Sequence, residues 1–143
     1  MQFLLDVNLL IALAMPGHEF HESAHKWFRK DPQRRWATCP LTQAGFLRVA
    51  SRSLGGTRDH LNMAIELLEI NSLSSNHEYW PVDVDLRDLD LAQRQHLIGP
   101  NQVADLQLLS LAHRRRGQLA TFDKGIRELA VGTRYASSYC CLL

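Results

Sequence analysis

Two aspartates directly follow short apolar runs that are predicted to be buried strands. Asp6 follows the run at residues 3–5, and Asp123 follows the run at residues 119–122. If both strands are parallel members of one sheet, their carboxyl ends meet at the edge where ligands bind in such folds. Each aspartate alone could serve only as a helix cap or a turn residue. Together they indicate an acidic site at that edge.

Asp105 is a third acid, and it lies in the apolar stripe of a predicted helix. At helical spacing it shares a face with Leu108, Leu109 and Ala112, the stripe that should meet the sheet. A carboxylate there is costly unless it is paired, binds a metal or lies where the stripe ends. The alternative is a purely structural acid, since the first turns of a helix favour negative charge.

Three acids at one edge would repel each other strongly. Two unit charges ~4 Å apart repel by about 4 kcal/mol at an effective dielectric of ~20. No Lys or Arg immediately flanks Asp6 or Asp105, so a divalent cation is the natural compensating charge. Carboxylate oxygens suit Mg²⁺ or Mn²⁺, which keep several waters for a phosphate substrate and a nucleophile. The pattern therefore predicts hydrolysis of a phosphodiester.

The elements that must position these acids follow from the apolar periodicity and the turn residues. Strands are predicted at residues 3–5, 36–39, 79–84, 119–122 and 135–139. Helices are predicted at residues 7–15, 21–29, 40–54, 85–97, 102–116 and 126–130, with one more from Thr57 that buries Met63, Ile65, Leu67 and Leu68. This alternation predicts an α/β fold, a three-layer α/β/α domain with a mostly parallel central sheet, over residues 1–143.

Length, charge and cysteine content narrow the class of protein. The chain has 143 residues, 45% of them hydrophobic and 22% charged, which suits one globular domain. Its formal charge of +1 means that a nucleic acid would meet local basic patches rather than a strong overall field. Three cysteines form neither a disulfide framework nor a zinc motif, which favours a reducing cytoplasm. The apolar stretch at residues 7–15 is too short to span a membrane, so no membrane partner is expected.

Three runs resemble a PIN domain when they are taken in order. They are Leu5-Asp6-Val7-Asn8, Val103-Ala104-Asp105-Leu106 and Leu119-Ala120-Thr121-Phe122-Asp123. The small single-domain form is similar to the VapC-type toxins of bacterial toxin–antitoxin pairs. This resemblance implies a cytoplasmic endoribonuclease that depends on Mg²⁺ or Mn²⁺ and forms a homodimer. Its implied partners are an RNA, such as a tRNA or an rRNA, and a cognate antitoxin protein.

The resemblance also assigns roles to individual residues. Asp6, Asp105 and Asp123 would be catalytic acids that hold the metal, and Asn8 and Thr121 would be supporting polar residues. Each assignment rests on the position of the residue within the three matching runs.

One position departs from the family pattern. The family usually has a glutamate in the first turn after the second strand, where this chain has no acid and Gln43 is the best substitute. The amide of Gln43 would complete the catalytic set without bringing a charge. Arg48 and Arg52 lie one turn apart on the same predicted helix, where RNA phosphate contact and a plain exposed face are equally compatible with the sequence.

Several alternatives stay open at this level. The lost glutamate favours a catalytically silent PIN module that binds RNA or a partner. A phosphotransfer domain with Asp6 as nucleophile would lack the second acid expected two residues later.

Three other groups of residues have a structural and a functional interpretation. His18, His21 and His25 have metal-compatible spacing but are predicted to form a solvated helix face. The basic run at residues 113–116 is predicted to favour a helix end, with RNA contact as the alternative. The acidic run at residues 83–90 is predicted to be a capping and solvated segment.

Overall fold

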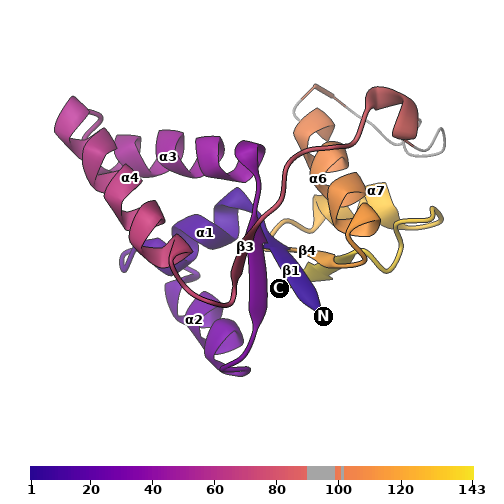
Figure 1. Ribbon diagram of the computed structural model, residues 1–143, viewed down its shortest axis with the longest axis horizontal. Coiled ribbons are helices and arrows are strands. Elements are labelled where there is room, and N and C mark those ends of the chain that lie inside the picture. The colour runs from indigo at the N-terminus through magenta and orange to yellow at the C-terminus, as the bar shows by residue number, and fades with distance from the viewer. Residues whose placement is uncertain (90–98, 101) are drawn as a thin grey trace.

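A parallel sheet forms the centre of the protein (Figure 1), seen here in a computed structural model that describes residues 1–89, 99–100 and 102–143. The described strands are β1 Gln2–Leu5, β2 Arg35–Thr38, β3 His77–Tyr79, β4 Gln118–Thr121 and β5 Tyr139–Cys141. Their order is β3-β2-β1-β4-β5, and every neighbouring pair is parallel. The predicted α/β fold class is therefore confirmed.

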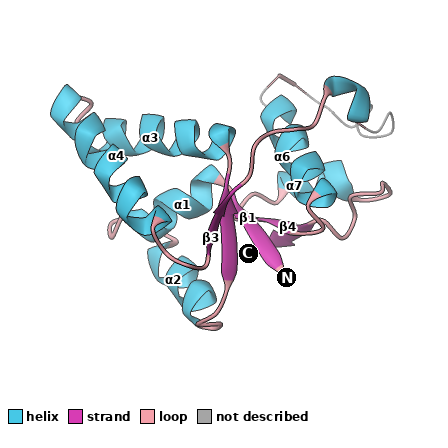
Figure 2. Ribbon diagram, viewed as in Figure 1, coloured by secondary structure: helices cyan, strands magenta, loops and turns pink. Residues whose placement is uncertain are grey.

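Helices cover both faces of this sheet (Figure 2). The described helices are α1 Val7–Ala14, α2 His21–Arg29, α3 Pro40–Leu54, α4 Arg58–Ser72, the 3-10 helix η1 Leu86–Asp88, α6 Gln102–Arg114 and α7 Gly125–Ala130. Helices α1 to α4 pack on one face of the sheet, over Leu5 and Ala120. Helices α6 and α7 pack on the other face, over Leu4 and Leu119. Alternation along β1 and β4 thus supplies one apolar residue to each layer.

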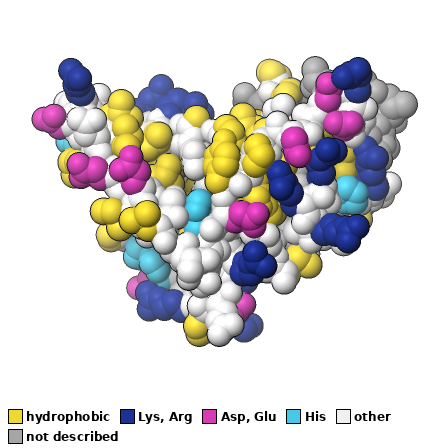
Figure 3. Space-filling model, viewed as in Figure 1, with side chains coloured by type: hydrophobic (Ala, Val, Ile, Leu, Met, Phe, Trp, Pro, Cys, Tyr) yellow, Lys and Arg dark blue, Asp and Glu magenta, His cyan; other side chains and the backbone are white. Residues whose placement is uncertain are grey.

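The register of β1 and β4 brings two polar residues together at the end of the sheet. Leu5 pairs with Ala120, so the next positions, Asp6 and Thr121, are neighbours. We call the end of the sheet at Asp6, Thr38 and Thr121 the carboxyl edge. The outline of the molecule is notched between α3 and α6 above this edge (Figure 3). The acids that follow β1 and β4 therefore share a position that a substrate can approach.

Two predicted strands are wrong in their bounds. The strand predicted at residues 79–84 is β3, which ends at Tyr79 because Pro81 has no amide hydrogen to continue the ladder. The strand predicted at residues 135–139 begins only at Tyr139. Tyr135 is fully buried and accepts a turn hydrogen bond from the amide of Ser138 at 2.8 Å. Residues 135–138 therefore form a packed turn rather than a strand.

Two helix predictions also need correction. The helix predicted at residues 85–97 begins with only the short η1, and residues 90–98 lie outside the described part of the chain. In α4 the side chain of Met63 is 52% exposed, although the apolar pattern predicts its burial, and Ala64 is buried in its place. Together with exposed Ile70, seven residues later on the same side of the helix, Met63 forms an apolar outer face on α4. In the described part of the chain, no helix combines the length and apolar character needed to cross a membrane.

Candidate functional site at the carboxyl edge

Asp6 lies at the junction of β1 and α1, where its side chain caps the helix. Its Oδ1 accepts a hydrogen bond from the Val7 amide at 2.7 Å, and its Oδ2 accepts one from the Thr121 hydroxyl at 2.7 Å. The residue is only 8% exposed. Burial raises the pKa of Asp6, whereas these two hydrogen bonds lower it and the charge of Asp123 raises it further. Asp6 is thus both the cap expected from the sequence and a buried carboxylate held in one orientation.

Asn8 and Thr121 fix the end of β4 against the first turn of α1. The Asn8 amide donates to Thr121 Oγ at 3.2 Å, and Asn8 Oδ1 accepts from the Phe122 amide at 3.2 Å. Thr121 Oγ also accepts from the Asp123 amide at 2.9 Å. The two predicted supporting residues therefore join both strand-end acids in one hydrogen-bonded unit.

Asp105 projects from the first turns of α6 as the third acid. Its neighbours Leu108 and Leu109 are buried, as the helical pattern predicts, and Asp105 itself is partly buried. Burial raises the pKa of Asp105 to about 6, and the charges of Asp6 and Asp123 add to this effect. The carboxyl of Asp105 therefore binds a proton much more tightly than an ordinary aspartate.

Asp123 is the exposed member of the group. Its Oδ1 accepts a hydrogen bond from the Gly125 amide at 2.7 Å, which closes the turn into α7. Asp123 therefore has the role of a turn residue, which the sequence offered as one alternative. Its charge nevertheless raises the pKa of both Asp6 and Asp105, so the three acids act on one another across the carboxyl edge.

The arrangement of these acids fits a hydrated divalent ion better than a closed metal cage. Among the described His, Cys, Asp and Glu side chains, no group of three lies close enough together to form a ready-made metal site. Mg²⁺, however, usually keeps several waters and needs only one or two direct carboxylates. Carboxylates that raise one another's pKa have the donor type and the negative charge that such an ion would satisfy.

Gln43 lies in the first turn of α3, and its side chain bonds to the end of β2. Helix α3 starts behind Cys39 with Pro40, which suits the first helical position. The Gln43 amide donates to Thr38 Oγ at 3.0 Å, and the Thr38 hydroxyl is hydrogen-bonded to His77 Nε2 at 2.8 Å. No hydrogen bond in the described part of the chain joins Gln43 to an acid. Sequence reasoning missed the chain from Gln43 through Thr38 to His77, because the last contact spans 39 positions.

Arg48 and Arg52 are both exposed on α3, and neither forms an ion pair within the described residues. They follow Gly45, which lies against the start of α1. A Cβ at Gly45 would come within 2.5 Å of Val7 Cγ2. A close contact between α3 and α1 thus places the two arginines on a helix that borders Asp6.

The histidines of α2 have a role that the sequence did not reveal. The prediction of a solvated face is wrong for His21 and His25, which are partly buried. Their ring nitrogens lie 2.8 Å from the carbonyl oxygens of Ala12 and Leu13. These carbonyls belong to the last turn of α1, which has no intrahelical donors for them. The two histidines therefore cap the C-terminal end of α1, and Asp6 caps its N-terminal end.

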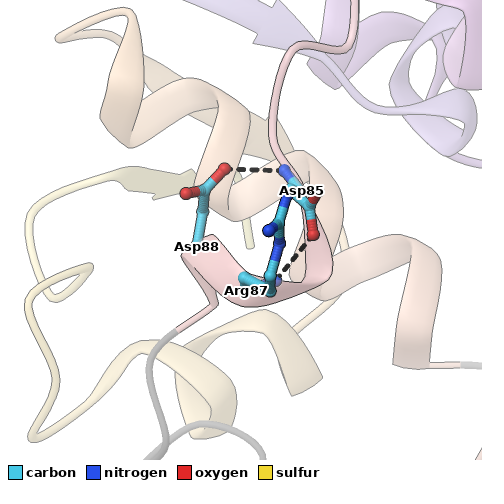
Figure 4. A network of polar contacts seen from close by, with 3 residues as sticks. All are labelled: Asp85, Arg87 and Asp88. Atoms are coloured by element: carbon cyan, nitrogen blue, oxygen red, sulfur yellow. Dashed lines mark hydrogen bonds and ion pairs between the residues drawn. The ribbon is translucent and has the colours of Figure 1, made fainter.

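The basic run at residues 113–116 and the acidic run at residues 83–90 form ion pairs and hydrogen bonds within the chain. Arg114 and Arg115 both lie within 4 Å of Asp83, at 3.4 and 3.6 Å. Asp85 and Asp88 cap η1 (Figure 4): the Asp88 carboxylate accepts from the Asp85 amide at 2.7 Å, and Asp85 pairs with Arg87 at 2.9 Å. The acidic run thus has the capping role predicted for it, while Asp90 lies outside the described residues.

A parallel α/β/α sheet with interacting carboxylates at its carboxyl edge is the architecture of a PIN-type domain. Residues 3–132 match the PIN domain family, and the chain belongs to this family. Its curated relatives make it VapC-like. It is 39% identical to Ribonuclease VapC44 of Mycobacterium tuberculosis over 131 residues, which covers 92% of both chains. It is 37% identical to Ribonuclease VapC39 of the same species, over 91% of this chain and 94% of the relative.

Solved structures support the same fold at much lower identity. FitAcB from Neisseria gonorrhoeae matches with a TM-score of 0.65 and 19% identity, over 89% of this chain and 91% of that one. VapC20 of M. tuberculosis, described as a toxin that cleaves the sarcin-ricin loop, matches with a TM-score of 0.60 and 15% identity, over 87% and 92%. VapBC2 from Rickettsia felis, bound to a DNA fragment from its promoter, matches with a TM-score of 0.53 and 16% identity, over 86% and 88%.

Proposed function

We propose that this protein is a metal-dependent endoribonuclease and the toxin of a toxin–antitoxin pair. The observation that carries this proposal is the mutual electrostatic effect of Asp6, Asp105 and Asp123 at the carboxyl edge. The curated relatives, which are ribonucleases over nearly the whole chain length, support RNA as the substrate. The proposal includes Mg²⁺ or Mn²⁺ as the cofactor and a reducing cytoplasm as the place of action, in keeping with three free cysteines.

Asp6 and Asp105 would hold the ion, with Asp123 contributing through its charge or through a bound water. When bound, the ion supplies Lewis-acid catalysis for attack on the phosphodiester. The chain's own residues orient the reaction. Asp6 is fixed by Val7 and Thr121. The carboxyl of Asp105, which has a pKa of about 6 in the metal-free protein, would release its proton when it binds the ion. Gln43 would act only as an uncharged neighbour of this set.

The substrate that suits this edge is an RNA whose backbone can enter the notch between α3 and α6 (Figure 3). Loops and single-stranded segments, such as those of a tRNA or an rRNA, expose such a backbone. Arg48 and Arg52 on α3 would contact phosphates on either side of the scissile bond. These contacts would position the RNA without reading its sequence, because phosphates are the same at every nucleotide. They would weaken as salt concentration rises, because binding releases counterions from the RNA.

The proposed protein partners are a cognate antitoxin and a second copy of the chain. FitAcB and VapBC2 are the fold neighbours that favour an antitoxin partner for this chain as well. The exposed apolar side chains of α4, among them Met63 and Ile70 at 52% and 67% exposure, are compatible with a surface that a partner covers. Light scattering of the purified chain, alone and with the product of the adjacent reading frame, measures both assemblies.

The test of the catalytic proposal compares three proteins on RNA. Wild type is expected to cleave single-stranded or loop RNA only with Mg²⁺ or Mn²⁺, and Asp105→Asn is expected to abolish cleavage. Asp59→Asn is the matched control, because Asp59 is an exposed acid on α4. Equal cleavage by a folded Asp105→Asn protein would contradict the assignment of this acid.

A catalytically silent PIN module is the second candidate, and the neutral Gln43 favours it. This candidate predicts that the wild-type protein binds RNA or its antitoxin at every metal concentration but leaves RNA intact. Mapping RNA ends after expression of wild type and Asp6→Asn separates the two candidates. New ends that depend on Asp6 support the nuclease, and identical ends in both cultures support the silent module.

A further inference from the structure

Three aromatic rings run outward from the carboxyl edge to the protein surface. Phe122 lies between Thr121 and Asp123, is only 5% exposed, and stacks on Phe20 with ring centroids 4.7 Å apart and an interplanar angle of 18°. The His18 ring lies 5.9 Å from Phe20 at a tilt of 47°. Phe20 and His18 are partly buried. We call Phe122, Phe20 and His18 the aromatic column.

The inner end of the column is tied to the site itself. The amide of Phe122 donates to Asn8 Oδ1 at 3.2 Å, and the neighbouring amide of Asp123 donates to Thr121 Oγ at 2.9 Å. The column therefore starts within the hydrogen-bonded unit that holds Asp6 and Asp123. The outer end follows the last turn of α1, whereas Asp6 caps the first turn, so a group bound at His18 would lie about one length of this 8-residue helix from Asp6.

The outer end of the column is held in a defined orientation. His18 Nδ1 accepts a hydrogen bond from the Phe20 amide at 3.1 Å, so the neutral ring carries its proton on Nε2. The His18 amide donates to the Met15 carbonyl at 3.0 Å, and the His21 amide donates to the His18 carbonyl at 3.0 Å. These backbone contacts fix the loop between α1 and α2. The column thus ends in a partly buried imidazole that, in its neutral form, carries an N–H donor on Nε2.

We propose that the aromatic column is a stacking site for one unpaired nucleobase of a single-stranded RNA. The proposal deepens the proposed function and rests on it for the nature of the ligand. Unpaired bases stack on phenylalanine and histidine rings, and their edges accept hydrogen bonds from donors such as His18 Nε2. Because His18 lies beyond the opposite end of α1 from Asp6, the stacked base would belong to a nucleotide some distance along the strand from the scissile phosphate. The column would therefore hold the RNA in place without taking part in the chemistry.

The stacking site makes a prediction that simple core packing does not. If His18 only covers Phe20, its replacement changes stability and leaves RNA affinity unchanged. If His18 also stacks on a base, His18→Ala weakens RNA binding by the folded protein by roughly fivefold to 150-fold, the range found per stacked base. His18→Phe keeps a ring and should retain most of the affinity. In an active enzyme, His18→Ala should raise KM more than it lowers kcat.

The experiment uses full-length Asp105→Asn protein, so that RNA is bound without being cut. A short single-stranded RNA carries 2-aminopurine at each position in turn, and stacking is detected as quenching of its fluorescence. His18→Ala and Phe20→Leu are compared with His60→Ala, a histidine at the junction of α3 and α4. We expect quenching at one position, lost in His18→Ala and Phe20→Leu, retained in His18→Phe and unaffected by His60→Ala.

The outcomes separate this inference from the proposed function. Quenching and affinity that are the same in His18→Ala, Phe20→Leu and the starting protein would overturn the stacking site even if wild type cleaves RNA. Absence of any RNA binding by the starting protein would overturn it as well. Quenching that depends on His18 would support it even if wild type cleaves no RNA, in which case only the nuclease proposal fails.

Discussion

Replacing Asp105 with asparagine should stabilise the metal-free protein at neutral pH, although most substitutions destabilise. The pKa of Asp105 rises from 3.8 to about 6, first through burial and then through the charges of Asp6 and Asp123. A shift of about two pKa units corresponds to about 3 kcal/mol, and solvent screening of this partly exposed carboxyl reduces the effect to on the order of 1–2 kcal/mol. Asparagine has nearly the shape of aspartate, so packing around residue 105 is preserved. The melting temperature should therefore rise by roughly 3–8 °C.

The pH dependence of this gain has a defined sign. The folded-state pKa of Asp105 lies above its unfolded value, so ionisation of Asp105 costs stability as pH rises from about 4 to about 6. Below that window the carboxyl is protonated in both states and the cost vanishes. The difference in stability between Asp105→Asn and wild type should thus be small near pH 4 and complete above pH 6.

Thermal melting in EDTA at several pH values, and then in millimolar Mn²⁺, measures both effects. An ion at ~100 times its Kd stabilises by about 2.7 kcal/mol, which should raise the melting temperature of wild type and of Asp59→Asn. Asp105→Asn should lose most of this response. A stability difference that is equal at pH 4 and pH 7 would refute the electrostatic reasoning. An equal response of Asp105→Asn and wild type to Mn²⁺ would refute the metal site.

Three further variants, one of them a double substitution, probe the surroundings of the acids. Gln43→Glu adds a charge to α3 and should lower the Mn²⁺ concentration for half-maximal cleavage, whereas an unchanged requirement would place residue 43 outside the influence of the ion. Arg48→Gln with Arg52→Gln should weaken RNA binding and reduce the slope of log affinity against log salt by about 0.7 for each phosphate that the arginines neutralise, which a salt titration measures. Gly45→Ala should clash with Val7 and cost about 1–3 kcal/mol in urea unfolding, and an unchanged midpoint would show that α3 shifts freely.

The central elements and the acids were predictable because local signals agreed with the packing. The run before Asp6 is apolar, Asp6 is a favourable helix cap, and the run before Asp123 is a second buried strand. Parallel pairing then places both acids at one edge of the sheet. Asp105 could be recognised because a carboxylate in an apolar helical stripe conflicts with burial unless it serves a site.

The remaining features depend on contacts between distant parts of the chain. The edge strand β3 has only three residues, His77–Tyr79, and two of them are exposed, so its pattern carries little information. Tyr135 looks like a strand residue but packs as a buried turn. The direction of the Gln43 amide is set by Thr38 and His77, and no local pattern indicates it. Exposure of Met63 follows from where α4 meets α3, which periodicity alone does not fix.

The neutral side chain of Gln43 would affect both the metal-free and the metal-bound state of the proposed site. A carboxylate at this position would be a fourth acid at the carboxyl edge, and like charges repel one another more strongly the closer they lie. An amide avoids that repulsion in the metal-free protein, and its hydrogen bond to Thr38 holds the start of α3 on β2. The same absence of charge removes attraction for a divalent ion. If the proposed metal site exists, Gln43 would thus favour a more stable metal-free edge at the cost of weaker metal binding, and the activity would require a higher free concentration of the ion.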